Sequence, residues 1–244
     1  ATLGNIVIDG GSFALTTGTD GVQAENSLII NDGSFVIKTG GGSANASVRT
    51  EDHGFGGREW GKWGDWNSSV TTTEEGSTSS AKGLKAGVTL EITGGYFELD
   101  TSDDALHSNA NVTIAGGEFF ITSGDDGAHA DEVLRIEGDN KFRVTKSYEG
   151  LEALEVVING GEIEITASDD GLNAAGGADG SGFERPGAGR FGEGQGEVTI
   201  NGGMLTVNAA GDGLDSNGNL TINGGTVTVF GPTNGGNGVL DYGG

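Results

Sequence analysis

Residues 103–131 of the chain read DDALHSNANVTIAGGEFFITSGDDGAHAD. Within this stretch an Asp pair and a His each recur after 22 residues, so that His129 repeats His107. The same interval separates most members of a set of Ile residues along the chain: Ile8, Ile30, Ile92, Ile114, Ile136, Ile158, Ile200 and Ile222. Two intervals exceed 22, by 40 and by 20 residues, and each equals one period plus an insertion. The chain therefore contains eight copies of one repeat.

Each repeat contains three short segments in which apolar and polar residues alternate. In the repeat of Ile114 they are residues 112–114, 119–121 and 128–130, and Gly, Asn or Asp residues separate them. Such segments are typical of strands, and no segment has a helical period. Three strands per 22 residues, always in the same order, predict an all-β parallel β-helix, a solenoid of eight coils. Each coil pairs its backbone with the coils on either side.

The most regular apolar residues are expected to form the interior of the solenoid. All eight Ile residues should be buried, one above another, about 4.8 Å apart. A second column consists of Phe in the first five repeats, shifted by one residue in the fifth: Phe13, Phe35, Phe97, Phe119 and Phe142. A Gly-Gly pair follows the Ile in six repeats and is expected at a sharp corner, where positive φ is required.

The whole chain, residues 1–244, is predicted to be a single solenoid domain with two insertions. Residues of about 41–80 interrupt the second repeat between its second and third strands, and residues of about 175–194 follow the third strand of the sixth repeat. Long loops of this kind commonly carry function. The chain begins with Ala1 and not Met, which indicates a processed or truncated product.

The composition excludes several classes of function. With 36 Asp and Glu against 12 Lys and Arg, the net charge is −24, which makes nucleic acid and anionic membrane surfaces poor partners. No apolar stretch approaches the roughly 20 residues of a membrane-spanning helix. There is no Cys, so neither a disulfide framework nor a thiolate metal site is available.

Acidic residues recur in the turn before each third strand. We call them the acid column: Asp20, Asp103, Asp104, Asp125, Asp126, Glu149, Asp169, Asp170 and Asp212. Lys82 takes this position in the second repeat. Stacked about 5 Å apart, like charges repel by about 1 kcal/mol in water and by more where water is excluded. Ca²⁺, which prefers carboxylate and carbonyl oxygens, would relieve this repulsion. We therefore predict a calcium site, to which Asp131 and Asp215 add ligands.

Two other interpretations of the acid column stay open. Asp favours turns because its side chain bonds its own backbone, although six turns in register, three of them with doubled acids, exceed what this preference explains. The middle residue of the third strand adds His107, His129, Glu152, Asn173 and Asp215 as potential ligands. A Zn²⁺ site needs three or four nitrogen or sulfur ligands, so two His residues among many Asp favour Ca²⁺ instead.

Several of these segments resemble, in their order, a family of secreted bacterial carbohydrate-binding β-helix proteins. The matching segments are SAKGLKA (80–86), SDDALHSN (102–109), GDDGAHAD (124–131), SYEGLE (147–152), SDDGLNAAGG (168–177), GDGLDSNG (211–218) and GPTNGGNGVLDY (231–242). That family is described for cellulose and acidic plant polysaccharides such as polygalacturonate, and it is similar to family-9 pectate lyases. The resemblance implies a right-handed coil, a secreted or cell-surface location, and Asp103, Asp104, Asp125, Asp126 and Asp131 as calcium ligands.

The first functional hypothesis is therefore a calcium-stabilised module that binds polysaccharide without cleaving it. Bound Ca²⁺ can bridge the acidic face to uronate carboxylates, which the bare face would repel. All three Trp residues, Trp60, Trp63 and Trp66, lie in the first insertion, where exposed aromatic rings could stack on sugars. The simpler interpretation is that these Trp residues pack against the flank of the solenoid.

The second hypothesis is a calcium-dependent lyase, which needs a base of lowered pKa next to a bound uronate. Lys82, which takes the acid-column position of the second repeat, is the one candidate for a catalytic residue whose position the repeat predicts. However, surrounding carboxylates raise the pKa of a Lys, which is the wrong direction for a base unless Ca²⁺ neutralises them first. A Lys–Asp pair that replaces one calcium ion is the favoured interpretation of Lys82.

The third hypothesis is structural. A β-helix ends in open strand edges, and end-to-end stacking of such edges would produce a fibre. The sequence is compatible with this self-association and contains no evident cap.

Overall fold

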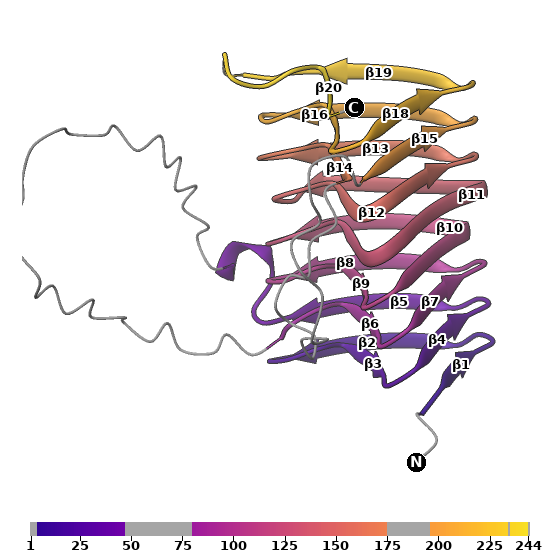
Figure 1. Cartoon of the computed structure of the whole chain (residues 1–244). Helices are drawn as coiled ribbons and strands as arrows, with labels where there is room; N and C mark the ends of the chain where they lie inside the picture. The colour runs from indigo at the N-terminus through magenta and orange to yellow at the C-terminus, as the bar shows by residue number, and fades with distance from the viewer. Residues whose placement is uncertain (1–3, 47–79, 175–195, 234, 244) are drawn as a thin grey trace, which may run out of the picture.

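The computed structural model describes residues 4–46, 80–174, 196–233 and 235–243, and these residues form eight stacked coils (Figure 1). Each coil contributes one segment to each of three parallel sheets. The first sheet contains β1 (Ile6–Ile8), β4 (Ser27–Ile30), β7 (Thr89–Ile92), β15 (Glu197–Ile200) and β18 (Asn219–Ile222). The second contains β2 (Ser12–Thr17), β5 (Ser34–Thr39), β8 (Tyr96–Thr101), β13 (Glu162–Ala167), β16 (Met204–Ala209) and β19 (Thr226–Phe230).

The third sheet contains the shortest strands, each of three residues. They are β3 (Val22–Ala24), β6 (Leu84–Ala86), β9 (Leu106–Ser108), β14 (Leu172–Ala174), β17 (Leu214–Ser216) and β20 (Leu240–Tyr242). In the middle of the stack, three strands are long enough to continue round a corner: β10 (Asn111–Ser123), β11 (Ala128–Lys146) and β12 (Leu151–Ile158). Strands β10 and β12 each belong to two sheets, and β11 runs through all three. One short 3₁₀ helix, η1 (Ser43–Asn45), follows β5.

The register confirms the predicted all-β parallel solenoid. Every strand pairing among the described residues is parallel, and equivalent residues of successive repeats face one another, as Ile30 faces Ile92. Phe rings stack in the second column, with centroids 4.7 Å, 4.9 Å and 4.5 Å apart in the first four coils. Because each coil covers the apolar side chains of the coil below, the core runs continuously along the axis of the stack.

The two terminal coils depart from the prediction that all eight Ile residues are buried. Ile8 is partly buried in the first coil, and Ile222 is 46% exposed in the last. The prediction was wrong for Ile222, because a side chain in a solenoid is covered by the coils on both sides and the described residues place a coil on only one side of β18. The six intervening Ile residues are fully buried.

The fifth coil contains a one-residue slip that cancels within the same coil. The pairing of β10 with β11 skips one residue between Ile136 and Asp139, so that Phe142 faces Phe119. Between Ala130 and Val133, the pairing of β11 with β12 shifts back by one residue, which restores the 22-residue register. As a consequence the rings of Phe119 and Phe142 are tilted by 49° at 5.3 Å, whereas the rings below them are stacked.

The predicted glycine corner between the first two sheets is confirmed. One glycine of each corner has positive φ in all eight coils, from 73° at Gly138 to 139° at Gly33. At Gly203, where φ is 84°, an added Cβ would lie 2.8 Å from the backbone of Gly160 in the coil below. Glycine is therefore required both by conformation and by the close approach of two coils.

The structure describes β5 up to Thr39 and β6 from Leu84, and β14 up to Ala174 and β15 from Glu197, and most of the two predicted insertions falls outside the described residues. Trp60, Trp63 and Trp66 also fall outside the described residues. Among the described residues no helix is long and apolar enough to cross a membrane.

Candidate metal-binding column

The acid column stands at the corner that leads into the third sheet. In several of its residues, one carboxylate oxygen accepts a backbone N–H from the neighbouring coil. Oδ1 of Asp104 accepts the backbone N–H of Asp126 at 3.1 Å, and Oδ1 of Asp126 accepts that of Glu149 at 3.4 Å. The same contact recurs in three further pairs: Lys82 N–H to Asp20, Asp212 N–H to Asp170, and Gly238 N–H to Asp212. Part of the preference for Asp here is therefore structural, since these N–H groups need acceptors.

The second oxygen of each acid has a different environment along the stack. In coil three, Oδ2 of Asp104 accepts from Lys82 Nζ at 2.6 Å, and Lys82 also reaches Oδ1 of Asp103 at 2.9 Å. Lys82 and Asp104 are both fully buried. Although burial raises the pKa of Asp104, the charge of Lys82 and the hydrogen bond from His107 outweigh it and hold that pKa well below its usual value. The carboxylates of coil three are thus neutralised by a cation of the protein itself, Lys82 of the neighbouring coil.

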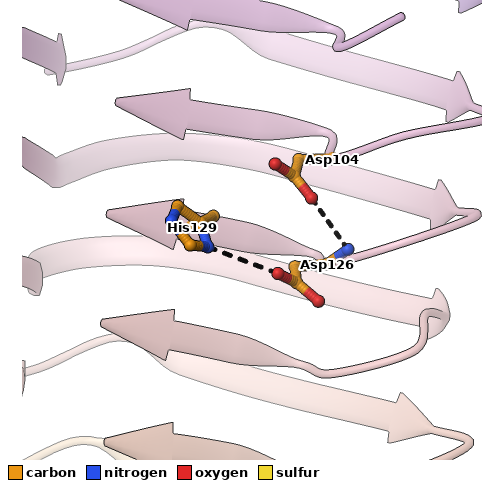
Figure 2. A group of neighbouring side chains, drawn as sticks. All are labelled: Asp104, Asp126 and His129. Atoms are coloured by element: carbon orange, nitrogen blue, oxygen red, sulfur yellow. Dashed lines mark hydrogen bonds and ion pairs between the residues drawn. The ribbon is translucent and has the colours of Figure 1, made fainter. Parts of the chain in front are cut away.

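Coil four uses histidine for the same purpose. The buried rings of His107 and His129 stack 5.0 Å apart, and His129 points to the carboxylate of Asp126, at 3.4 Å (Figure 2). His129 Nδ1 lies closer to Glu152, at 2.7 Å, and its Nε2 lies 3.1 Å from Asp131. Burial alone would lower the pKa of His129, but the hydrogen bonds to these three carboxylates raise it well above its usual value.

The carboxylates around His129 differ in charge. Burial raises the pKa of Glu152, but its hydrogen bonds to His129 and Asp126 and the charge of His129 together outweigh this and leave that pKa below its usual value. Burial raises the pKa of Asp126 well above its usual value, and the charges of Asp104, Glu152 and Asp125 raise it further. Glu152 is therefore the ionic partner of the histidine, and Asp126 is the group that favours a proton or a cation.

In coils five to seven the acids face one another. Burial raises the pKa of Glu149 well above its usual value, and the charge of Glu152 adds to the effect. Burial and the charges of Asp169 and Asp212 raise the pKa of Asp170 to about 7. Asp215 is raised to a pKa of about 6 by burial and by the charges of Asp212 and Asp241. The described residues after Lys146 include no Lys, Arg or His.

The residues present fit a cation with oxygen ligands. Five groups of three side chains bring one ligand atom each within 4.8 Å of the others, and all five belong to the acid column and the third-sheet residues beside it. This span matches two oxygens bound to one Ca²⁺, at about 2.5 Å each. The group of Glu149, Asp169 and Asp170 has further support, because Oε2 of Glu149 and Oδ1 of Asn173 are buried without a hydrogen-bond partner. Buried oxygens of this kind are normally satisfied.

The structure thus assembles most of the predicted ligands, with two exceptions. The five groups use Asp103, Asp104, Asp125, Asp126, Glu149, Asp169, Asp170, Asp212 and Asp215, and they add His129 and Glu152. Asp20 joins no group among the described residues, since it accepts from Ser80 at 2.6 Å and lies 3.8 Å from Lys85. Asp131 joins none either and contacts His129.

One acid of this surface was missed. Asp241 of β20 faces Asp215 in register and contributes to its raised pKa. The signal in the sequence is the segment Leu240–Tyr242, which resembles Leu214–Ser216. A longer corner before β20 hides the 22-residue spacing that identified the other acids.

The family model described as "Carbohydrate-binding domain-containing protein" matches residues 1–127, which is just over half of the chain and spans the first four coils up to the start of the third strand of the fourth. No curated protein and no solved structure matches the chain.

Proposed function

Since the chain belongs to the family of carbohydrate-binding domain-containing proteins, we propose that it binds an acidic or cellulosic polysaccharide outside the cell without cleaving it. We propose in addition that Ca²⁺ occupies the acid column. The observation that carries the calcium assignment is the group of Glu149, Asp169 and Asp170, together with the unpartnered Oε2 of Glu149 and the unpartnered Oδ1 of Asn173 beside it.

The role proposed for the ion is neutralisation of charge between coils. When bound, Ca²⁺ supplies positive charge that links carboxylates of successive coils. Oδ1 of Asp170 meanwhile remains on the N–H of Asp212, at 2.5 Å, and keeps the backbone of the two coils together. Binding to the folded state alone stabilises it by about 2.7 kcal/mol per site at a hundredfold excess over Kd.

The environment of Lys82 supports binding over cleavage. Its ammonium group is fully buried and donates to Asp103 and Asp104, at 2.9 Å and 2.6 Å. Two carboxylates at these distances favour the protonated amine, whereas a lyase needs a neutral amine that can accept a proton from the sugar. Lys82 is therefore assigned to the interior of the column and not to catalysis.

A binding experiment with and without calcium tests the proposal. We expect metal analysis of the purified protein to detect calcium, chelation with EGTA to lower the unfolding midpoint, and the protein to be retained on polygalacturonate or cellulose. Asp170→Asn should lose the response to EGTA, and Asp139→Asn, which removes an exposed acid outside the column, should keep it. An unchanged midpoint after complete removal of metal would contradict the calcium assignment. Growing absorbance of unsaturated sugar during incubation with polygalacturonate would show a lyase instead.

A second candidate function is end-to-end assembly into a fibre. It is favoured by the apolar side chains that the last coil exposes, of which Phe230 is 57%, Leu240 49% and Tyr242 63% exposed. Sedimentation and electron microscopy test it. Filaments that disappear in Leu240→Glu would support assembly, and a monomer at all concentrations would refute it.

A further inference from the structure

The outer face of the second sheet contains two adjoining hollows. The first, of about 260 Å³, lies over Phe120, Lys141 and Arg143, between Glu118 and Glu164. The second, of about 540 Å³, lies over Thr206, Asn208 and Phe230. Arg143 and Glu164 line both, so the two hollows form one track across β10, β11, β13, β16 and β19, along the axis of the stack.

The first hollow lies at the coil that contains the register slip. The buried rings of Phe119 and Phe142 lie beneath it and are tilted by 49°, whereas Phe97 and Phe119 are stacked within 5°. Strands β10 and β11 stay paired across this position, where Phe119 faces Phe142 and Phe120 faces Arg143.

The track has an aromatic wall. Tyr96 is 38% exposed, and its ring lies 5.7 Å from that of Phe120 at 46°. The guanidinium group of Arg143 lies 5.9 Å from the centre of the Phe120 ring, on the neighbouring strand. Phe230, 57% exposed, lies at the other end of the track. Exposed aromatic rings along a groove provide flat apolar faces, which suit the apolar faces of sugar rings.

The second sheet carries more than half of the Lys and Arg residues in the described part of the chain. Seven Lys and Arg residues occur in the described part of the chain, and four of them lie on strands of the second sheet: Lys38, Lys141, Arg143 and Lys146. Lys38 is paired with Asp100, and Lys146 donates to the carbonyl of Ser43. Lys141 and Arg143 are the two exposed cations that line the track.

Arg143 is positioned by one ion pair and has further N–H donors on its guanidinium group. Its Nε donates to Glu164 at 2.7 Å, and this is its one ion pair among the described residues. The remaining N–H groups of the guanidinium fork suit a carboxylate in two-point contact. Cross-strand ion pairing alone would explain why Arg143 and Glu164 face each other. However, Lys141 forms no ion pair with the flanking Glu118 or Glu162 within the described structure. Ion pairing also gives no reason for the exposed aromatic rings.

We propose that this track, lined by Phe120, Lys141, Arg143 and Phe230 and flanked by Tyr96 beside Phe120, is the binding site for a polysaccharide chain that contains uronate sugars. The aromatic rings stack on pyranose faces, and Arg143 and Lys141 bind a uronate carboxylate. Two adjoining hollows along the axis favour an extended chain over a single sugar. The inference rests on the proposed function and locates its glycan on a different sheet from the acid column.

Substitution of the track against a matched control tests the inference. Affinity for polygalacturonate oligosaccharides is measured by calorimetry in calcium, for the wild-type protein, Arg143→Gln, Tyr96→Ala and Arg135→Gln. Arg135 lies on the same strand, β11, but in the first sheet, between Thr113 and Val157. We expect Arg143→Gln to weaken binding at least about tenfold, because a charge-assisted hydrogen bond is lost, and Arg135→Gln to leave it unchanged. Tyr96→Ala should weaken binding of acidic and neutral oligosaccharides alike.

The outcomes separate this inference from the proposed function. Wild-type binding that survives both Arg143→Gln and Tyr96→Ala overturns the inference and leaves the function intact. A wild-type protein that binds no glycan overturns the function and the inference with it. All track residues are surface side chains, and an unchanged unfolding midpoint shows that each variant folds.

Discussion

Acids of the column accept a backbone N–H from the next coil both in coils two to four, as Asp104 does, and in coils five to seven, as Asp170 does, but the two regions balance their charge differently. In the first region the protein provides cations of its own, Lys82 beside Asp104 and His129 beside Glu152. In the second region Asp170, Asp212 and Asp215 face one another. The comparison teaches that stacking carboxylates does not by itself create a need for metal, and that the need arises where counter-charge is missing.

The direction of the pKa shifts reflects this contrast. Asp104 has a pKa well below its usual value, and Asp170 has a pKa of about 7, although both accept an N–H from the next coil. The second insertion, outside the described residues, carries Arg185 and Arg190. Replacing both by Gln is therefore a useful control in each experiment below.

The largest effect is expected from removing the internal cation of the first region. Lys82→Met leaves Asp103 and Asp104 in the interior without their counter-charge, and breaking a buried ion pair in this way costs about 3–5 kcal/mol. We expect a large fall in the urea midpoint and partial recovery in calcium. The control is Lys38→Met, which breaks an exposed pair with Asp100 and should cost under about 1 kcal/mol. Equal losses in the two variants would contradict the comparison.

A change of opposite sign is expected in the second region. Asp170→Asn keeps the oxygen that accepts the N–H of Asp212 and removes the repelled charge, so it should stabilise the calcium-free protein at pH 8 by about 1 kcal/mol after allowance for solvent screening. Asp104→Asn, the matched change beside Lys82, should destabilise it. Chelator-treated samples in urea provide the measurement, and destabilisation by both variants would remove the distinction.

Between pH 5 and pH 8, a pH dependence of stability is expected in the second region from Asp170 and Asp215. The pKa of Asp170 rises from 3.8 to about 7 and that of Asp215 to about 6 on folding, so the folded state retains protons that the unfolded state has released. This stabilisation is complete below about pH 4 and is lost as the pH rises through 6 and 7. Without calcium, hydrogen exchange corrected for its intrinsic pH dependence should show greater protection of β16 and β17 at pH 5 than at pH 8. Saturating calcium should abolish the difference, and an equal change in β7 would refute the localisation.

The smallest effect is expected from changes in the apolar core, which separate differences in packing from differences in charge between the two regions. Ile200→Val removes a buried methyl group and should cost about 0.5–1.5 kcal/mol, whereas Ile222→Val at the half-exposed last coil should cost less. Neither value should depend on calcium. A calcium-dependent loss in Ile222→Val, measured by chemical unfolding, would show that packing of the last coil and ion binding are coupled.

The fold was predictable from the sequence because a solenoid converts spacing along the chain into position in space. A residue 22 positions from Ile114 can lie only above or below it, so the Ile, Phe and Asp columns follow from counting. The exposure of Ile222 and the role of Asp241 were not predicted, because within the described residues a coil covers β18 on one side only and the corner before β20 is longer than the others.

The residues of the candidate site could be predicted from the sequence, but the way in which their charges are compensated could not. Spacing placed Asp104 and Asp126 in one column, but only distances show that Lys82 satisfies the first and that His129 prefers Glu152 to the second. The one-residue shift at Phe142 was visible in the sequence. The tilt of that ring pair and the hollow beside Arg143 depend on packing, which spacing does not describe.

The stacking of equal coils also determines how the molecule would respond to mechanical load. The hydrogen bonds between coils run along the axis, so tension between the ends acts on one ladder at a time, starting at the last coil, where Ile222 and Phe230 are half-exposed. Each coil that peels away releases roughly 70 Å of chain, given 22 residues at an extended length of about 3.3 Å each. Extension would therefore proceed in uniform steps, and a cross-link between two coils through the carboxylates of Glu149 and Asp170 would act as a brake near the middle of the stack.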